Sequence, residues 1–463
     1  RDNGTLRYAS WEAALENLVA GLEEIRDEEG GEAIGILAGP YLSREEAGLA
    51  VDLAASLKTP HLDLSGIEDR AMLGGIERSP AEPMPVTGIE EIEAMTATLL
   101  IGDLFTVAPC MAKPILQARY DRRRNLQGVL ASSNHRTDWF GKPHLRCRPG
   151  EEASALALLV RRALLGDPSR EIPWREEAEA LFDRVDLARL EREAGLDLET
   201  ATWFVESLRS EEHTGVFLST GFGGSERPDL VAGLAAMLAE ATGSRLVAMP
   251  NGANAVGVRD VLRASGYPTA EGLTAPEMWD AARTGDIKAL IVLGHDPLGA
   301  LPGDLAAAIA ERNPLLAVTT PLPSATVDAA RVVLPALFWG EKEGSVRPAI
   351  DCELELKPAL RGPGDARADA TILADLIRRI GPASTKRSEA PRNRADFFEE
   401  LEFNYRIDSK RGGTLEAGRH LLLPRLLPAH TDCGWLTSNL SWPLHEYPVA
   451  TISLSPAHAE SLG

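Results

Sequence analysis

Residues that could do chemistry stand directly after predicted buried strands. His295 and Asp296 follow the apolar run Ala289–Leu293 in a Gly-Xaa-Asp-Pro turn. Gly102 and Asp103 open the turn after another apolar run. Loops at the carboxyl ends of parallel strands are where α/β proteins hold nucleotides. A histidine there could contact a phosphate or act in acid–base catalysis, and the simpler interpretation is a turn residue with satisfied hydrogen bonds.

Two further loops could meet a phosphate. His135 and Arg136 lie in the polar segment after a third apolar run, and arginine readily makes a bidentate phosphate contact. A surface or interface role is the alternative for this pair. The segment STGFGGSE, with Gly221 and Gly223, lies between a predicted strand and a predicted helix, as a phosphate-binding loop would. It lacks the GxGxxG spacing and the Walker lysine, so its glycines could equally serve only a tight turn.

The elements that would position these loops alternate between strand and helix. Alternation of this kind predicts an α/β fold with doubly wound parallel sheets. The predicted strands are Ala33–Leu37, Thr98–Ile101, Gly128–Ala131, His144–Arg148, Gly215–Leu218, Arg245–Met249, Ala289–Leu293, Leu315–Val318 and Arg331–Leu334. The predicted division is a discontinuous α/β domain (1–64 and 211–385), an inserted α/β domain (65–210), a linker (386–414) and the start of a β-rich domain (415–463).

Composition narrows the class of protein. A chain of 463 residues is too long for one core, so we expect two to four domains. The net charge of −21 argues against nucleic acid and anionic membrane surfaces as main partners. No apolar run approaches the roughly 18 residues of a membrane helix. No two of the four cysteines lie within five residues of each other, which argues against an iron–sulphur cluster or structural zinc held by this segment alone. The opening residues look like the middle of a longer polypeptide.

The order of segments resembles the molybdopterin oxidoreductase superfamily. The matching segments are ASWEAAL (9–15), LLIGDLFTVAP (99–109), LRCRPGEEASALALL (145–159), MPNGANAVGVRDV (249–261) and ARVVLPALFWGEKEGS (330–345). The closing VATISLSPAHAESLG resembles the start of that family's terminal β-barrel. The fold implied is two doubly wound parallel-sheet domains of the molybdopterin oxidoreductase type, followed by a C-terminal β-barrel.

Within the superfamily, the chain is most similar to the large iron–sulphur subunit of NADH–quinone oxidoreductase (complex I). GPYLSREEA, TPHLDLSG and ALIVLGHDPLGALP carry this likeness. The resemblance implies a domain that has lost the metal and serves as a structural part of the complex. Iron–sulphur clusters would then lie in an upstream region or in partner subunits.

The resemblance also assigns roles to several residues. Asn251 and Asn254 lie in a loop that contacts the pterin in active relatives; in a metal-free relative they would satisfy backbone groups instead. Asp69 falls where active relatives place a metal ligand, and the alternative is a loop carboxylate in solvent. If a pterin is bound, its contacts would come from Gly102, Asp103, His135, Arg136, Gly221, Gly223, Asn251, Asn254, His295 and Asp296.

Other positions depart from the family pattern. The loop GSVRPAIDCELEL (344–356) lacks the family's Asn and Arg, and SSNHRTDW (132–139) lacks the strand-end carboxylate that would grip a ribose. These losses favour a segment without a working metal site and with no catalytic residues of its own.

We therefore expect a subunit of an NADH–quinone oxidoreductase-like complex, with no cofactor in this segment and with cluster- and flavin-bearing partners. We expect it to be cytoplasmic and not itself membrane-spanning. As part of a complex, it could lie at the periphery of the inner membrane. Whether the segment is an enzyme is left open. One alternative is an active molybdopterin or tungstopterin dehydrogenase of the formate or formylmethanofuran type, holding bis-molybdopterin guanine dinucleotide. Another is a free-standing nucleotide-binding α/β module.

Overall fold

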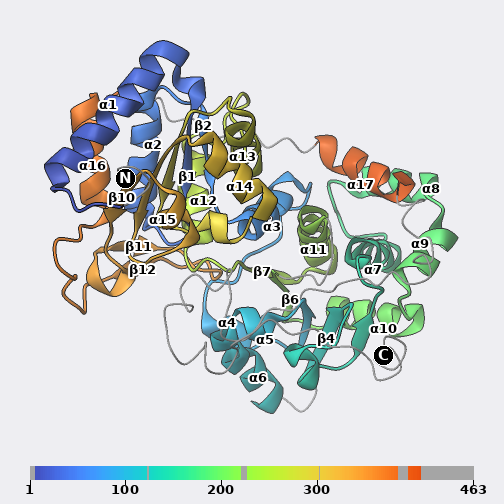
Figure 1. The fold of residues 1–463 in the computed structure, drawn as a ribbon. Coiled ribbons are helices and arrows are strands. Elements are labelled where there is room, and N and C mark those ends of the chain that lie inside the picture. The colour runs from blue at the N-terminus through green and yellow to red at the C-terminus, as the bar shows by residue number, and fades with distance from the viewer. Residues whose placement is uncertain (1–5, 122–124, 221–226, 302, 384–394, 408–463) are drawn as a thin grey trace, which may run out of the picture.

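Two parallel five-stranded sheets form the framework of the computed structural model, which describes residues 6–121, 125–220, 227–301, 303–383 and 395–407 (Figure 1). The first sheet has the order β10-β9-β8-β1-β2, with β1 Ile34–Ala38, β2 His61–Leu64, β8 Ala289–Leu293, β9 Leu315–Thr320 and β10 Val332–Pro335. The second has the order β5-β4-β3-β6-β7, with β3 Ala97–Ile101, β4 Leu126–Ala131, β5 His144–Arg146, β6 Thr214–Ser219 and β7 Arg245–Met249. Every pairing within these two sheets is parallel, which confirms the predicted doubly wound α/β fold.

Helices bury both faces of the first sheet. One face is covered by α1 Trp11–Glu29, α2 Arg44–Leu57, α12 Ala255–Ala264 and α16 Asp369–Ile380. The other is covered by α13 Ala275–Thr284, α14 Gly303–Arg312 and α15 Ala325–Ala329. Side chains alternate between the two cores along each strand: Ile36 joins the first core and Leu37 the second. Burial on both faces explains why these strands read as continuous apolar runs.

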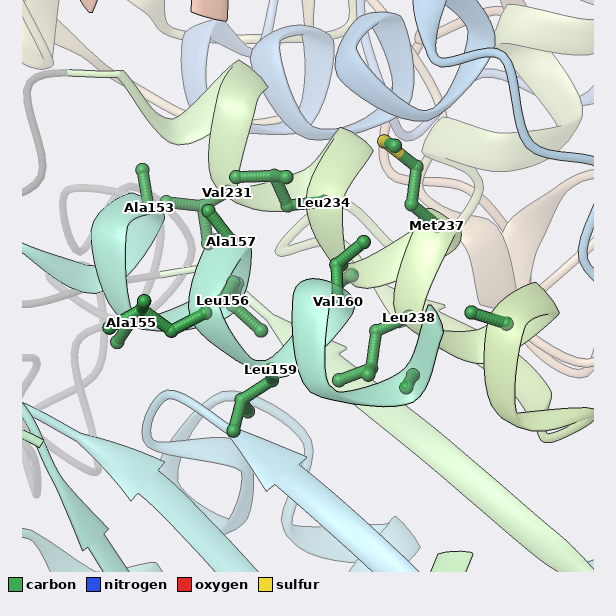
Figure 2. Packing of buried hydrophobic residues seen from close by; sticks show 14 of the residues in the cluster. Ala153, Ala155, Leu156, Ala157, Leu159, Val160, Val231, Leu234, Met237 and Leu238 are labelled. Carbon is green, nitrogen blue, oxygen red and sulfur yellow. The ribbon is translucent and has the colours of Figure 1, made fainter. Parts of the chain in front are cut away.

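The second sheet is covered in the same way. One face carries α7 Glu152–Gly166, α10 Leu198–Ser210 and α11 Pro228–Thr242, and the other carries α4 Ile89–Glu93, α5 Leu104–Val107 and α6 Ala112–Asp121. Figure 2 shows Ala and Leu side chains of α7 interlocking with Val231, Leu234 and Leu238 of α11 above the strands. The short helices α8 Arg175–Arg184 and α9 Leu187–Ala194 complete this core, so residues 166–210 are helical without a strand, as their pattern predicts.

Two helices join the sheets. α3, Ile67–Arg78, follows β2 of the first sheet and packs along α11 of the second (Figure 1). The crossing is close, because a Cβ on Gly75 would lie 2.0 Å from the carbonyl oxygen of Asp229. α17, Ala395–Ile407, follows the first sheet's α16 in the described chain but packs against the second sheet's helices through Phe397 and Leu401. The chain therefore crosses between the two cores more than once.

The predicted domain boundary at residue 210 does not fit the sheets. β6 and β7, which we assigned to the discontinuous domain, lie in the second sheet, where Leu218 pairs with Ile101. The strand signal that restarts at His213 indicates a strand but not its sheet. Within the predicted linker 386–414, α17 buries an apolar face against the second sheet's helices. Residues 384–394 and the predicted β-rich segment 415–463 lie outside the described residues.

A small antiparallel hairpin stands beside the first sheet. Its strands are β11 Gly344–Val346 and β12 Leu354–Leu356, within the segment that departs from the family pattern. Among the described helices, none combines the length and apolar character needed to cross a membrane.

Candidate functional site

The strand order gives each sheet a switch point, where the chain leaves neighbouring strands in opposite directions. In the first sheet the chain leaves β1 in one direction and β8 in the other, and in the second sheet it does so at β3 and β6. Ligands of doubly wound sheets bind beyond the carboxyl ends of the strands at such switch points. The loops after β1 and β8 contain Gly39 and Gly294, and the loops after β3 and β6 contain Gly102 and Thr220. Apart from Asp69, the predicted site residues that the structure describes lie in these loops or in the segments beside them.

His295 lies at the switch point of the first sheet and is buried. Its Nδ1 lies 2.8 Å from the hydroxyl oxygen of Ser65, which follows β2. The Tyr41 ring lies 6.2 Å from the imidazole, and the Trp339 ring packs edge-on against Tyr41. The indole of Trp339 also donates to the Tyr41 carbonyl oxygen at 2.5 Å. Side chains of the protein itself therefore pack around this histidine.

The neighbouring carboxylate, Asp296, is part of the loop structure. Its Oδ1 accepts a hydrogen bond from the Thr326 amide at 2.8 Å and another from the Thr326 hydroxyl at 2.5 Å. Thr326 lies in the first turn of α15, so Asp296 joins the loop after β8 to the start of that helix. Asp296 thereby holds the loop after β8 against α15 through one of its two carboxylate oxygens.

Asn254 is fully buried and joins three segments. Its side-chain amide donates to the Leu42 carbonyl at 2.6 Å, and its carbonyl accepts from the Arg347 amide at 2.7 Å. Its own backbone amide donates to the Pro40 carbonyl at 2.9 Å. The loop after β1, the start of α12 and the β11–β12 hairpin thus meet at one amide side chain. The Asn254 side chain therefore satisfies backbone groups of two of these segments.

Asp69 does not lie in the solvent-exposed loop that was the alternative to a metal-ligand role. It is 3% exposed and lies in α3, not in a solvent-exposed loop. Its two carboxylate oxygens accept hydrogen bonds from the Asn251 amide at 2.7 Å and the Gly252 amide at 2.9 Å. Both oxygens are therefore engaged with donors, which would repel a cation placed between them. The sequence around Asp69 gave no helix signal that we recognised, because Gly66 begins α3 without a side-chain cap.

At the second sheet, His135 lies between carboxylates. Its Nδ1 is 3.6 Å from an Asp103 oxygen and 3.9 Å from an Asp138 oxygen. The Thr137 hydroxyl donates to Asp103 at 3.1 Å, while Arg136 is exposed. Two carboxylates beside His135 disfavour a phosphate at that point, because like charges repel in a poorly solvated site.

At the same sheet, Gly102 allows the loop after β3 to lie close to the end of β6. Its φ of +80° favours glycine, and a Cβ there would lie 2.8 Å from the Ser219 hydroxyl oxygen. Gly221 and Gly223 lie outside the described residues.

A buried charged cluster near the first sheet was missed from sequence. Lys342 is 4% exposed, and its Nζ lies 2.7 Å from Glu46 and 3.3 Å from Asp369. Thr319, in β9, donates its hydroxyl to Asp369 at 2.5 Å. Burial, followed by the nearby Asp369 charge, raises the pKa of Glu46. Glu46 also forms a capping box with Ser43 at the start of α2, a local pattern that does not reveal its contact with the distant Lys342.

A second missed group is Glu152, at the start of α7. It is 3% exposed, and burial raises the pKa of its carboxyl to about 7. Neither carboxylate oxygen makes a well-formed hydrogen bond within the described part of the chain, although the Ser132 hydroxyl is near enough to offset burial in part. An acidic residue in the first turn of a helix is normally a surface feature, so the sequence did not distinguish this one.

Glu152→Gln is expected to flatten the pH dependence of stability. A folded-state pKa above the ordinary value of 4.5 means that the folded state binds the proton more tightly than the unfolded state. Glu152 therefore lowers stability progressively as the pH rises from about 4.5 to about 7, by about 3 kcal/mol in all. The glutamine variant should match the wild type near pH 4 and exceed it near pH 8 in urea unfolding. A constant difference across this range would contradict the expectation.

Metal binding has limited support from the described side chains. Within the described ranges, no group of three or more His, Cys, Asp or Glu residues has the arrangement of a metal site. The three described cysteines are unpaired and dispersed: Cys110 is exposed, Cys352 is half-buried, and Cys147 is buried. Burial raises the pKa of the Cys147 thiol, which disfavours the thiolate that a metal would need.

Comparison with known proteins shows which family and which relatives this chain is similar to. Residues 188–379 match the family model of molybdopterin oxidoreductases. The chain is 26% identical to the NADPH-Fe(3+) oxidoreductase subunit alpha of Geobacter sulfurreducens, over 88% of this chain and 52% of that protein. It is 28% identical to NADH-quinone oxidoreductase subunit 3 of Thermus thermophilus, over 82% of this chain and 43% of that protein. The chain thus spans about half the length of these curated relatives.

Solved structures share the fold. Acetylene hydratase from Pelobacter acetylenicus superposes with a TM-score of 0.63 at 15% identity, over 88% of this chain and 63% of that one. A chain of the formyltransferase/hydrolase complex from Methylorubrum extorquens superposes with a TM-score of 0.51 at 15% identity, over 81% of this chain and 96% of that one. The family match and the relatives identify a molybdopterin oxidoreductase domain in this chain. The two doubly wound sheets share the fold of the solved structures.

Proposed function

We propose that this segment is a structural, molybdopterin-oxidoreductase-fold part of an NADH–quinone oxidoreductase-like electron-transfer complex. The observation that carries the proposal is the state of the candidate cofactor groups at the first sheet. Asn254, Asp296 and Asp69 each use their side-chain oxygens in contacts between the protein's own segments. This domain keeps the family's architecture, but these groups make contacts within the protein. Such an arrangement is consistent with a structural role.

The contacts of the described residues at the first sheet's switch point support a segment without a pterin dinucleotide. A pterin needs several unpaired donors and acceptors together with an open approach between the loops. Tyr41 and Trp339 pack beside His295, and the Asn254 amide is paired on both its oxygen and its nitrogen. Binding would require these contacts to break, and each hydrogen bond lost from a buried group costs about 1–3 kcal/mol.

Electron transfer would then take place elsewhere in the assembly. Two of the relatives are named as subunits of an NADPH-Fe(3+) and an NADH-quinone oxidoreductase, which favours partners of the same kind. We propose partners that carry iron–sulphur clusters and flavin, in a cytoplasmic assembly that can meet the membrane at its periphery. This chain would contribute shape and contact surface to the assembly.

The test is purification of the tagged native protein with its assembly. The proposal expects a stoichiometric complex with iron–sulphur and flavin absorbance that oxidises NADH or NADPH, with neither chromophore bound by residues 1–463. A chain that purifies alone, stable and monodisperse without cluster-bearing subunits, would contradict the proposal and favour a free-standing α/β module.

A second candidate is an active molybdopterin or tungstopterin dehydrogenase of the formate or formylmethanofuran type. The likeness to nearly the whole of a chain from a formyltransferase/hydrolase complex favours it, although at 15% identity this likeness supports only the fold. Formate-dependent dye reduction by the purified assembly would support this candidate. Activity with NADH or NADPH and none with formate or formyl donors would reject it.

A further inference from the structure

The carboxylate of Asp69 connects the two sheets. α3 follows β2 of the first sheet, and the amides that Asp69 accepts from belong to Asn251 and Gly252, just after β7 of the second sheet. Two adjacent backbone N–H groups that precede a helix, here α12, form a place where an anion binds well. In this chain the anion is a side chain of the protein.

We propose that Asp69 is an internal latch: a built-in anion that fills this N–H pair and fixes the loop after β7 to α3. Charge-assisted hydrogen bonds of this kind are roughly twice as strong as neutral ones. The latch takes the position in which an external carboxylate or phosphate could otherwise be held. This inference concerns how the sheets are joined, and it holds whether or not the proposed function is correct.

The surrounding contacts strengthen the latch. The Asn251 side chain accepts from the Thr220 hydroxyl at 2.7 Å and donates to the Glu68 carboxylate at 2.9 Å. Thr220 follows β6, while Glu68 precedes Asp69 in α3. The loops after both β6 and β7 are therefore tied to the same turn of α3.

Steric fit points to the same role. A Cβ on Gly252 would lie 2.1 Å from the Pro40 Cβ and 2.8 Å from an Asp69 oxygen. Only glycine therefore allows the loop after β7 to approach both α3 and the loop after β1. The Asn254 amide, two residues on, donates to the Pro40 carbonyl at 2.9 Å. The closed arrangement depends on contacts from both sheets, with the Asp69 carboxylate at its centre.

The experiment is hydrogen exchange on Asp69→Ala, with acetate as a probe anion. Alanine is a better helix former than aspartate, so the substitution should leave α3 intact. We expect exchange in residues 249–256 to accelerate by about tenfold or more, which corresponds to a loss of about 1.4 kcal/mol in local stability. Asp296→Ala is the matched control, because that buried carboxylate also accepts an amide and a hydroxyl but within loops of one sheet. Its effect should be confined to residues around 326.

Chemical rescue separates an anion's role from simple packing. Added acetate should slow exchange in residues 249–256 of Asp69→Ala and raise its melting temperature more than equimolar chloride does, with a smaller effect on the wild type. Unchanged exchange in 249–256, or an equal effect of acetate and chloride, would overturn the latch. If Asp69→Ala does not fold, Asp69→Asn is measured instead. It keeps one acceptor, and unaltered exchange in the same segment would be equally decisive against the latch.

Discussion

Lys342→Met is expected to lower the free energy of unfolding by about 3–5 kcal/mol, because it removes the cation between two buried carboxylates. Glu46 and Asp369 are both buried, and Lys342 donates to each of them. Removing one partner of a buried ion pair leaves the other charge without compensation. Chemical unfolding in urea at pH 7 would measure the loss.

The pH dependence gives this expectation a signature. The pKa of Glu46 is raised by burial and by Asp369, so the folded state binds its proton more readily than the unfolded state does. Stability in the variant should therefore fall as the pH rises above about 4.5, and its deficit should shrink when the pH is lowered. Lys357→Met is the control. The Lys357 Nζ lies 3.0 Å from a Glu355 carboxylate oxygen, and both side chains are exposed, so this ion pair should contribute at most about 1 kcal/mol. Equal losses in the two variants would contradict the buried-cluster interpretation.

Phe397→Ala is expected to weaken the docking of α17 by about 3–5 kcal/mol. Phe397 is fully buried against the second sheet's helices, and a Cβ on Gly233 would lie 2.3 Å from its ring. The truncation leaves a cavity that the glycine cannot fill. Hydrogen exchange in residues 397–405 should accelerate first, since α17 is the element that loses the contact.

Phe338→Ala serves as the matched control for this substitution. Phe338 is the same residue type but is 41% exposed, so its loss should cost about 1 kcal/mol or less. If Phe397→Ala left exchange in α17 unchanged, the helix would not depend on this side chain, and its role in joining the sheets would have to be abandoned.

The sheets were predictable because each central strand is buried on both faces. Runs such as Ala289–Leu293 must then be apolar throughout, and a following Gly or Pro marks their end. Ser10 and Ser43 accept hydrogen bonds from the first turns of α1 and α2, and capping residues of this type are visible in a sequence. What the pattern could not assign was the sheet to which β6 belongs. Strand pairing is a long-range property, and the signal at 214–219 would look the same beside either neighbour.

The candidate site was predictable in location but not in its contacts. Loop position identifies His295 and Asn254, because carboxyl-end loops follow from the strand order. It does not reveal that Ser65, Leu42 and Arg347 are their partners, since these residues are distant in the chain. The burial of Asp69 and Glu152 was not visible in the sequence for the same reason. Charged residues are usually exposed, and only the packed fold shows that these two are buried.

The most direct test of the structural role is the pterin and metal content of the native protein, purified with its assembly. After denaturation and oxidation, a pterin dinucleotide gives a fluorescent product, and molybdenum and tungsten can be measured in the same sample. We predict no pterin and no molybdenum or tungsten in a fraction that retains its cluster-bearing partners. One pterin and one molybdenum or tungsten per chain, with substrate turnover that they support, would contradict the proposed function.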